Sequence, residues 1–234
     1  MRGAIIAAGE GSRLRRGGWT GSKAMASVGG QPLIGHALDR FRTSGFARVS
    51  VIINEASEDC RAWLADADLG LEIDLVIKTT PSSFASFDLL GRRLAGAPTV
   101  LTTVDGVMPE GDFAGFVAAV ARLPDDAIAL GVTPHVDDEA PLWADLDPES
   151  GRIRRLGGGP AGFVTAGVYA LPAARPALDG RRFERLREYL AWLVAEKYPV
   201  YGLVLPRVFD VDRPEDIVQA ERSLVEQVCP GGVG

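Results

Sequence analysis

The residues best suited to chemistry lie near the start of the chain, where a short apolar run opens into a glycine-rich loop. Residues 3–7 form a predicted buried strand, which leads into the sequence AAGEGSRL. Gly9 and Gly11 would let the main chain approach a phosphate and point successive N–H groups at it. Arg13 and Lys23 would supply the positive charge. The segment therefore predicts a triphosphate-binding loop.

The scarcity of lysine gives Lys23 added weight. The chain has 25 Lys and Arg residues, and its lysines are Lys23, Lys78 and Lys197. A lysine inside this loop therefore points to a specific role and not to a generic charge, because an ammonium and a guanidinium bind anions differently. The loop lacks the spacing of a P-loop, and Leu14 replaces the third glycine of a dinucleotide fingerprint. A tight turn without a ligand is the alternative interpretation.

An alternation of strands and helices must position these residues. Short apolar runs and helical periods alternate along the chain, which favours an α/β fold with a mixed, mainly parallel sheet. We expect a single Rossmann-like three-layer α/β/α domain over residues 1–229 and a flexible tail at 230–234. The predicted strands are 3–7, 49–53, 71–77, 98–104, 127–132, 143–147, 152–155 and 164–171. The predicted helices are 33–44, 57–67, 83–95, 113–123, 182–196 and 216–228.

The carboxyl ends of the predicted strands locate the candidate site. In an open parallel sheet, ligands bind beyond these ends. The rule selects the loop after the first strand, residues 78–86 after the third strand, and Asp105 after the fourth. These segments are therefore expected to meet at one edge of the sheet.

Composition excludes several classes of function. A net charge of −6 over 234 residues argues against binding to nucleic acid or an anionic membrane. Cys60 and Cys229 are far apart and form no metal-binding or redox motif. No signal peptide or long apolar segment is visible, so we expect a cytoplasmic protein without a membrane span. A homodimer is compatible with these features.

The N-terminal motifs resemble the signature of a known family. AAGEGSRL followed by SKAMASVGGQPLI is similar to nucleotidyltransferases that couple an NTP to a sugar phosphate or similar phosphate and release pyrophosphate. Ser22 and Gln31 depart from the family's usual Pro and Lys or Arg, and weaker matches continue to about residue 222. The resemblance implies the nucleotide-diphospho-sugar transferase fold. It also implies a nucleotide site at Ala7, Ala8, Gly9, Gly11, Ser12, Arg13 and Lys23.

The same resemblance implies a Mg²⁺ site built from aspartates. Asp105 stands where family members hold a metal ligand, and either Asp210 or Asp212 corresponds to a second, later one. Carboxylate oxygens suit this hard cation. A turn at Asp105 and a helix cap at Asp212 are the alternatives. Arg213 stands where the family commonly has Thr.

Other segments correspond to the base and acceptor sites of the family. Thr80, Ser82 and Ser83 would contact the base and ribose, in a Ser-rich version that favours CTP or UTP, although Ser83 could equally cap a helix. The resemblance places Trp143, Thr165 and Gly167 at the pocket for a small phosphorylated acceptor. Core packing is an equal alternative for the last two.

The implied reaction is an in-line attack of the acceptor phosphate on the α-phosphorus. Lys23 and Arg13 would be the catalytic residues, because they neutralise charge on the departing pyrophosphate. Neither His36 nor His135 supports a competing scheme. Three alternatives remain open: a molybdopterin guanylyltransferase-like enzyme, a non-catalytic nucleotide-binding domain, and a glycosyltransferase that uses a nucleotide sugar.

Overall fold

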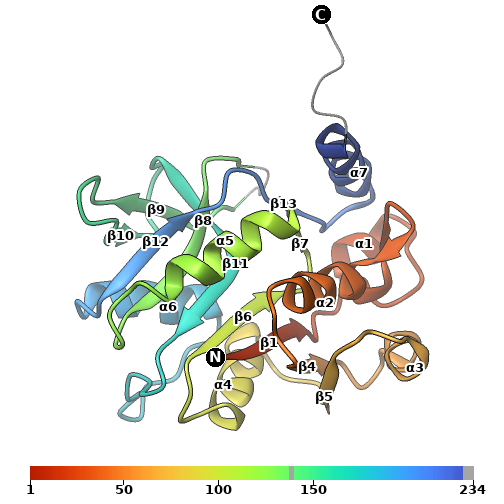
Figure 1. The fold of residues 1–234 in the computed structure, drawn as a ribbon, viewed down its shortest axis with the longest axis horizontal. Helices are drawn as coiled ribbons and strands as arrows, with labels where there is room; N and C mark the ends of the chain where they lie inside the picture. Colours follow the sequence, from red (N-terminus) through yellow and green to blue (C-terminus); the bar gives the residue numbers. More distant parts are fainter. Residues whose placement is uncertain (137–139, 229–234) are drawn as a thin grey trace, which may run out of the picture.

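The computed structural model describes residues 1–136 and 140–228 and contains one large mixed sheet (Figure 1). The sheet has nine strands, with helices packed on both faces. The tail expected at 230–234, like Cys229, lies outside the described residues. No helix in the described part is long and apolar enough to cross a membrane.

The N-terminal half of the chain builds the parallel part of the sheet. Its strands, in spatial order, are β6 (Thr99–Thr103), β1 (Arg2–Ala7), β4 (Arg48–Ile53) and β5 (Glu72–Ile77). Ile6 pairs with Thr103 on one side and with Ile52 on the other. These strands therefore end at the same edge, and the loops that follow β1 and β6 are neighbours.

The second half of the chain adds strands of both directions. They are β8 (Ile128–Thr133), β9 (Trp143–Leu146), β10 (Ile153–Leu156), β11 (Phe163–Leu171) and β12 (Val200–Val204). β11 is antiparallel to β6, β8 and β9, and β10 is antiparallel to β9. Because β10 and β11 oppose the other strands of the sheet, the predicted mixed, mainly parallel sheet is confirmed.

The helices form two layers around this sheet, as predicted. The chain contains α1 (Ser12–Arg16), α2 (Leu33–Thr43), α3 (Glu58–Asp66), α4 (Ser83–Arg93), α5 (Glu110–Val120), α6 (Leu186–Ala195) and α7 (Pro214–Val228). Side chains alternate along β1, so Ile5 joins a core with α2 and α5, whereas Ile6 joins a second core with α4 and α6. Figure 1 shows α2 and α5 in front of the sheet.

Several elements differ from the sequence-based expectation. Strand β12 was not predicted, because Gly202 interrupts its apolar run. A Cβ at Gly202 would lie 2.7 Å from Leu146, so the glycine permits close packing. The helix expected at 182–196 begins only at Leu186, where Glu188 accepts a 3.3 Å bond from the Arg185 amide. The helix expected from residue 113 begins at Glu110.

Smaller elements complete the edge where the parallel strands end. The turn of helix η1 (Lys23–Met25) precedes the hairpin of β2 (Ser27–Val28) and β3 (Gln31–Pro32). The short strands β7 (Gly106–Val107) and β13 (Phe209–Asp210) pair antiparallel. The second pairing places the late aspartates beside Asp105, although about 100 residues separate them in the sequence.

A partly exposed ion pair at the opposite edge makes the stability depend on pH. Hydrogen bonds from Arg93 at 2.6 and 2.7 Å, and one from Ser50 at 2.8 Å, lower the pKa of Asp74 from 3.8 to about 2. A depressed carboxyl pKa stabilises the fold above pH ~4, and this contribution is lost as the pH falls through ~2. We expect Asp74→Asn to lower the unfolding free energy at pH 6 but progressively less toward pH 2.

Urea unfolding between pH 2 and pH 6 measures this difference. Asp66→Asn, at an exposed position of α3, is the matched control and should leave the pH profile unchanged. A constant difference between Asp74→Asn and the wild type at every pH would contradict the prediction.

Candidate active site

Four charged side chains meet at the carboxyl ends of β1 and β6. Lys23 Nζ lies 2.7 Å from Asp105 Oδ2 and also contacts Asp212 Oδ1. Arg13 Nη1 lies 2.5 Å from the other oxygen of Asp212. We call Arg13, Lys23, Asp105 and Asp212 the Lys23 network. The network joins three segments that are distant in sequence, two of them selected by the strand-end rule.

The sheet and the short β7–β13 pairing hold the network in place. The Val104 amide donates to the Ile6 carbonyl at 3.0 Å, which continues the β1–β6 pairing to the residue before Asp105. The Val211 amide donates to the Asp105 carbonyl, also at 3.0 Å. Asp105 is thereby tied on one side to the strand that precedes the glycine-rich loop and on the other to the segment that carries Asp212.

Gly11 allows the loop to close over Lys23. It precedes α1 with a φ of 62°, a conformation that favours glycine. A Cβ at this position would lie 2.9 Å from the Cβ of Lys23. The second glycine of the motif therefore permits a close approach between the loop and the lysine.

Ser22 has a structural use that the proline of the family pattern could not serve. Its amide donates to Asp59 Oδ2 at 2.8 Å, and its carbonyl accepts from Trp19 Nε1 at 3.0 Å. Proline has no N–H to donate. The departure at Ser22 thus anchors the residue before Lys23 to α3.

Charge pairing keeps the buried members of the network ionised. Burial alone would lower the pKa of Lys23, whose side chain is 9% exposed, but Asp105 and Asp212 outweigh it and the pKa is raised. Burial alone would raise the pKa of Asp105, but Lys23 outweighs it and the pKa is lowered. An ammonium shared by two carboxylates is therefore the stable state of this site.

The donor set of the network fits a divalent cation that takes further ligands from phosphate. Within the described residues, no group of three or more His, Cys, Asp and Glu side chains is arranged to hold a metal ion. Asp105 and Asp212 are nevertheless close enough to share one ammonium. Two carboxylates of this kind supply hard oxygen ligands and leave the remaining positions to phosphate and water.

A polar cavity of about 200 Å³ adjoins the network. Its lining includes Asp105, Asp210 and Asp212. Of the predicted acceptor residues, Thr165 and Gly167 line the cavity, whereas Trp143 begins the neighbouring β9 and is not part of the lining. At Gly167, φ is 67° and a Cβ would lie 2.4 Å from Thr103 Oγ1, so this glycine allows the two strands to approach.

Three further residues of the cavity were missed by the sequence analysis. His135 follows β8, so its place at a strand end could have signalled it. Arg187 lies in the first turn of α6 and donates to the Ala140 carbonyl at 3.0 Å. Tyr169 is a β11 residue whose pKa is raised by burial and by the nearby Asp210 and Asp105. Nothing in the local sequence distinguishes Arg187 from a structural residue, whereas Tyr169 could have been found from its place in the same strand as Thr165 and Gly167.

The predicted base-binding hydroxyls make structural hydrogen bonds. Ser82 Oγ accepts from the Ala85 amide at 3.1 Å, so Ser82, and not Ser83, caps α4. Ser83 Oγ accepts from the Leu186 amide at 3.1 Å and fixes the start of α6. Thr80 Oγ1 lies 2.6 Å from Ser86 Oγ. This segment therefore connects α4 and α6 close to the end of β5.

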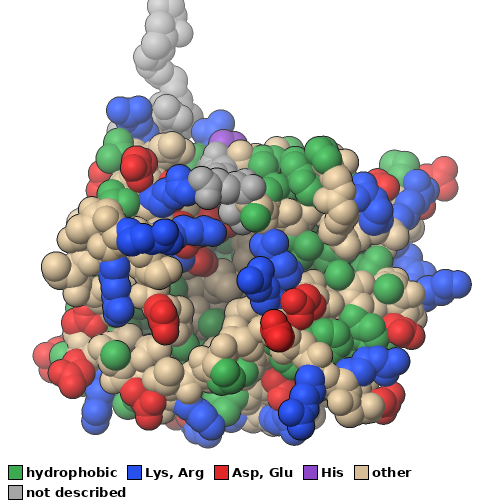
Figure 2. Space-filling model, turned by 180° about the vertical axis from the view of Figure 1, so that it is seen from behind, with side chains coloured by type: hydrophobic (Ala, Val, Ile, Leu, Met, Phe, Trp, Pro, Cys, Tyr) green, Lys and Arg blue, Asp and Glu red, His purple; other side chains and the backbone are tan. Residues whose placement is uncertain are grey.

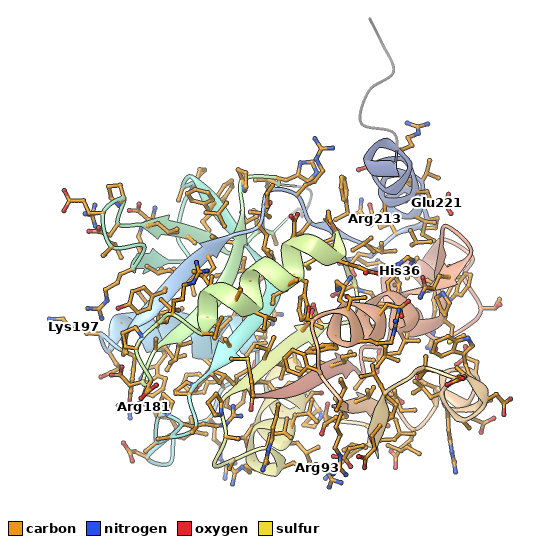
Figure 3. The ribbon with its side chains drawn as sticks, viewed as in Figure 1. His36, Arg93, Arg181, Lys197, Arg213 and Glu221 are labelled. Carbon is orange, nitrogen blue, oxygen red and sulfur yellow. The ribbon has the colours of Figure 1, made fainter. Side chains whose placement is uncertain are left out.

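Two other features contain ionisable groups without forming a site of this kind. A larger hollow of about 1170 Å³ lies at the amino-terminal edge of the parallel strands, where Arg93 is paired with Asp74. This edge is opposite to the one at which parallel sheets bind ligands. His36, on α2, has its Nε2 2.8 Å from the Val28 carbonyl and thus makes a structural contact (Figure 3).

On the face opposite to Figure 1, the surface is hollowed near its middle, with Lys and Arg side chains around the margin (Figure 2).

Comparisons with known proteins agree with this architecture. The chain is 23% identical to the low-salt glycan biosynthesis nucleotidyltransferase Agl11 of Haloferax volcanii, over 97% of the chain and 66% of that relative. The chain therefore spans slightly less than two thirds of the length of this relative.

Two solved structures share the fold. A Bacillus anthracis protein described as a glucose-1-phosphate thymidylyltransferase matches with a TM-score of 0.80 and 16% identity, over 98% of the chain and 97% of that structure. The inositol-1-phosphate CTP transferase of T. maritima matches with a TM-score of 0.77 and 21% identity, over 100% of the chain and 98% of that structure.

The family model for the MobA-like NTP transferase domain matches residues 3–187. The chain therefore belongs to the MobA-like NTP transferase family.

Proposed function

We propose that this protein is a nucleotidyltransferase that couples an NTP to a small phosphorylated acceptor and releases pyrophosphate. The observation that carries the proposal is the Lys23 network, in which a buried ammonium is held by two carboxylates beside a glycine-rich loop. Family membership and the adjoining polar cavity support it. The chemistry requires positioning and charge stabilisation and no covalent enzyme intermediate.

The proposed reaction takes place at the α-phosphorus of the NTP. An oxygen of the acceptor phosphate forms the new P–O bond, and the bond to the β-phosphate breaks so that pyrophosphate leaves with the electron pair. Lys23, Arg13 and the amides between Gly9 and Ser12 stabilise the negative charge on this leaving group. Ala7 and Ala8 lead the backbone into the loop.

Asp105 and Asp212 would hold the divalent cation, for which Mg²⁺ is our choice. When bound, this cation supplies further electrostatic stabilisation between the phosphates. Both late aspartates line the cavity, and Asp212 is favoured over Asp210 because it shares Lys23 with Asp105. Asp105 stays ionised because the Lys23 ammonium lies beside it and lowers its pKa.

The cavity lined by Thr165 and Gly167 is the proposed acceptor site. Its volume of about 200 Å³ suits a molecule of the size of a sugar or polyol phosphate. Arg187 is the one Lys or Arg among the described residues of its lining, and a guanidinium recognises phosphate well. Thr80, Ser82 and Ser83 remain the proposed base-contacting residues, although their hydroxyls also serve the local structure.

CTP with a polyol phosphate is the first pair to test, because a structural neighbour is named as an inositol-1-phosphate CTP transferase. The experiment measures pyrophosphate release with Mg²⁺ for ATP, GTP, CTP, UTP and dTTP, each with sugar 1-phosphates, polyol phosphates and phosphocholine. One productive pair supports the proposal and identifies both substrates. NTP binding without pyrophosphate release for any acceptor would contradict it in favour of a non-catalytic nucleotide-binding domain.

Arg187 should determine affinity for the acceptor. We expect Arg187→Met to raise the KM for the acceptor phosphate by about tenfold to a hundredfold, because a charged hydrogen bond to phosphate is lost. The KM for the NTP should change by less than about threefold, since the Lys23 network stays intact. Steady-state kinetics with each substrate varied in turn measures both constants.

Arg182→Met, an exposed position just before α6, is the matched control for the loss of one positive charge. Equal increases in both KM values for Arg187→Met, or the same acceptor effect in Arg182→Met, would show that Arg187 does not bind the acceptor.

A further inference from the structure

Arg40 is a buried cation that the proposed mechanism does not use. It lies on α2, is 1% exposed, and its guanidinium carbon is 6.0 Å from the centre of the Phe113 ring. Neither Nε nor Nη2 has a hydrogen-bond partner among the described residues. Buried charges are normally paired, because removing a charge from water is costly.

The position of Arg40 places its charge behind the active-site segment. Helix α2 packs against β7, which begins directly after Asp105, and against α5, which begins at Glu110. Burial lowers the pKa of Arg40 to about 10, whereas Glu110 and Asp105 act in the opposite direction. The side chain is therefore a cation at neutral pH, and its charged form is favoured by Glu110 and, to a smaller extent, by Asp105.

A fixed positive charge at this place has opposite effects on the binding of a nucleotide and of a divalent cation. It attracts the phosphates of a nucleotide and repels a divalent cation held at Asp105, and both effects are strengthened by a low local dielectric. An apolar side chain of similar length could fill the same space between α2 and Phe113 without the cost of a buried charge. Packing alone therefore does not account for an arginine here.

We propose that Arg40 is a positioning residue of the active site, whose buried charge lowers the affinity of the Asp105 side for a divalent cation and raises the affinity of the site for triphosphate. The inference rests on the proposed function, since it assumes that the Lys23 network binds both ligands. In this arrangement the cation is held firmly only together with the phosphates. Its retention after pyrophosphate has left is disfavoured.

The test compares Arg40→Met with Arg42→Met. Arg42 lies on the same helix, with its side chain 48% exposed and paired with Asp39, so its substitution removes one charge without touching the core. Two affinities are measured without turnover: Mn²⁺ binding to the nucleotide-free protein, by the electron paramagnetic resonance of free Mn²⁺, and CTP and GTP binding in EDTA, by calorimetry. Thermal unfolding reports on the fold of each variant.

For Arg40→Met we expect Mn²⁺ to bind about fivefold tighter and the metal-free nucleotide about fivefold weaker, as removal of a nearby charge requires. Arg42→Met should change neither affinity. Arg40→Lys keeps the charge and should restore both values, and it preserves the test if the methionine variant does not fold. A purely structural role predicts instead that both ligands bind more weakly in Arg40→Met.

Weaker binding of both ligands, or equal effects in Arg40→Met and Arg42→Met, would overturn the inference. So would a wild-type protein that binds no Mn²⁺ with or without nucleotide. Failure of the proposed function has a different signature, because it shows in the wild type as nucleotide binding without pyrophosphate release for any acceptor. The opposite shifts in the two affinities would still be measurable in that case.

Discussion

Lys23→Met is expected to lower the rate of pyrophosphate release by about 10³-fold, the scale on which a preorganised charge acts in catalysis. The substitution keeps the aliphatic part of the side chain, which is largely buried, and removes the ammonium that contacts Asp105 and Asp212. The loss should appear mainly in kcat, because the leaving-group charge that Lys23 stabilises develops in the transition state.

The fold should survive this substitution, because the surrounding sheet and the β7–β13 pairing do not depend on the ammonium. Circular dichroism and thermal unfolding check this point. Lys197→Met is the matched control: Lys197 is exposed after α6, on the side of the molecule away from α1 (Figure 3). Full turnover in Lys23→Met would refute the assigned role, and an equal loss in Lys197→Met would point to an indirect effect.

Asp105→Asn and Asp212→Asn should each reduce turnover by about 10²-fold to 10⁴-fold, whereas Asp210→Asn should reduce it by less than about tenfold. An amide keeps the shape of the carboxylate and removes its charge. Asp105 and Asp212 share Lys23, so each loss leaves both the lysine and the proposed cation with one carboxylate fewer. Asp210 pairs with Gly106 through the backbone and lines the polar cavity, whereas Lys23 contacts Asp105 and Asp212.

Initial rates of pyrophosphate release over a range of Mg²⁺ concentrations separate these three variants. A raised Mg²⁺ requirement in Asp105→Asn and Asp212→Asn would support their role as ligands. Asp125→Asn, in an exposed loop, controls for the loss of a negative charge. A severe defect in Asp210→Asn together with a mild one in Asp212→Asn would reverse the assignment of the second ligand.

The Lys23 network also connects three loops through a small number of charged groups. One lysine from the loop after β1 neutralises carboxylates from the segments after β6 and β13, while Arg13 binds the outer oxygen of Asp212. Three loops are thus fixed relative to one another by the same groups that are proposed to bind phosphate and metal. Substitutions in the network should therefore affect substrate binding and loop order together.

Local sequence determined the elements whose signals are strong. The continuous apolar runs of β1 and β4, and the helical period that ends at Gly45, are short-range patterns that can be recognised without the rest of the chain. The motif around Gly9, Gly11 and Lys23 was recognisable for the same reason. Elements with weak local signals, such as β12 with its central glycine, were missed because pairing with β8 stabilises them.

Tertiary structure decided which distant residues share a site. The sequence left Asp210 and Asp212 as equal alternatives, because two positions separate them and both precede the same helix. The pairing of β13 with β7 distinguishes their positions, since Asp210 lies opposite Gly106 and Asp212 contacts Lys23, although both line the polar cavity. His135, Arg187 and Arg40 gained their positions in the same way. Sequence by itself determined the glycine-rich loop and the fold class, and only the packed sheet determined the partners of that loop, because those contacts join residues up to 199 positions apart.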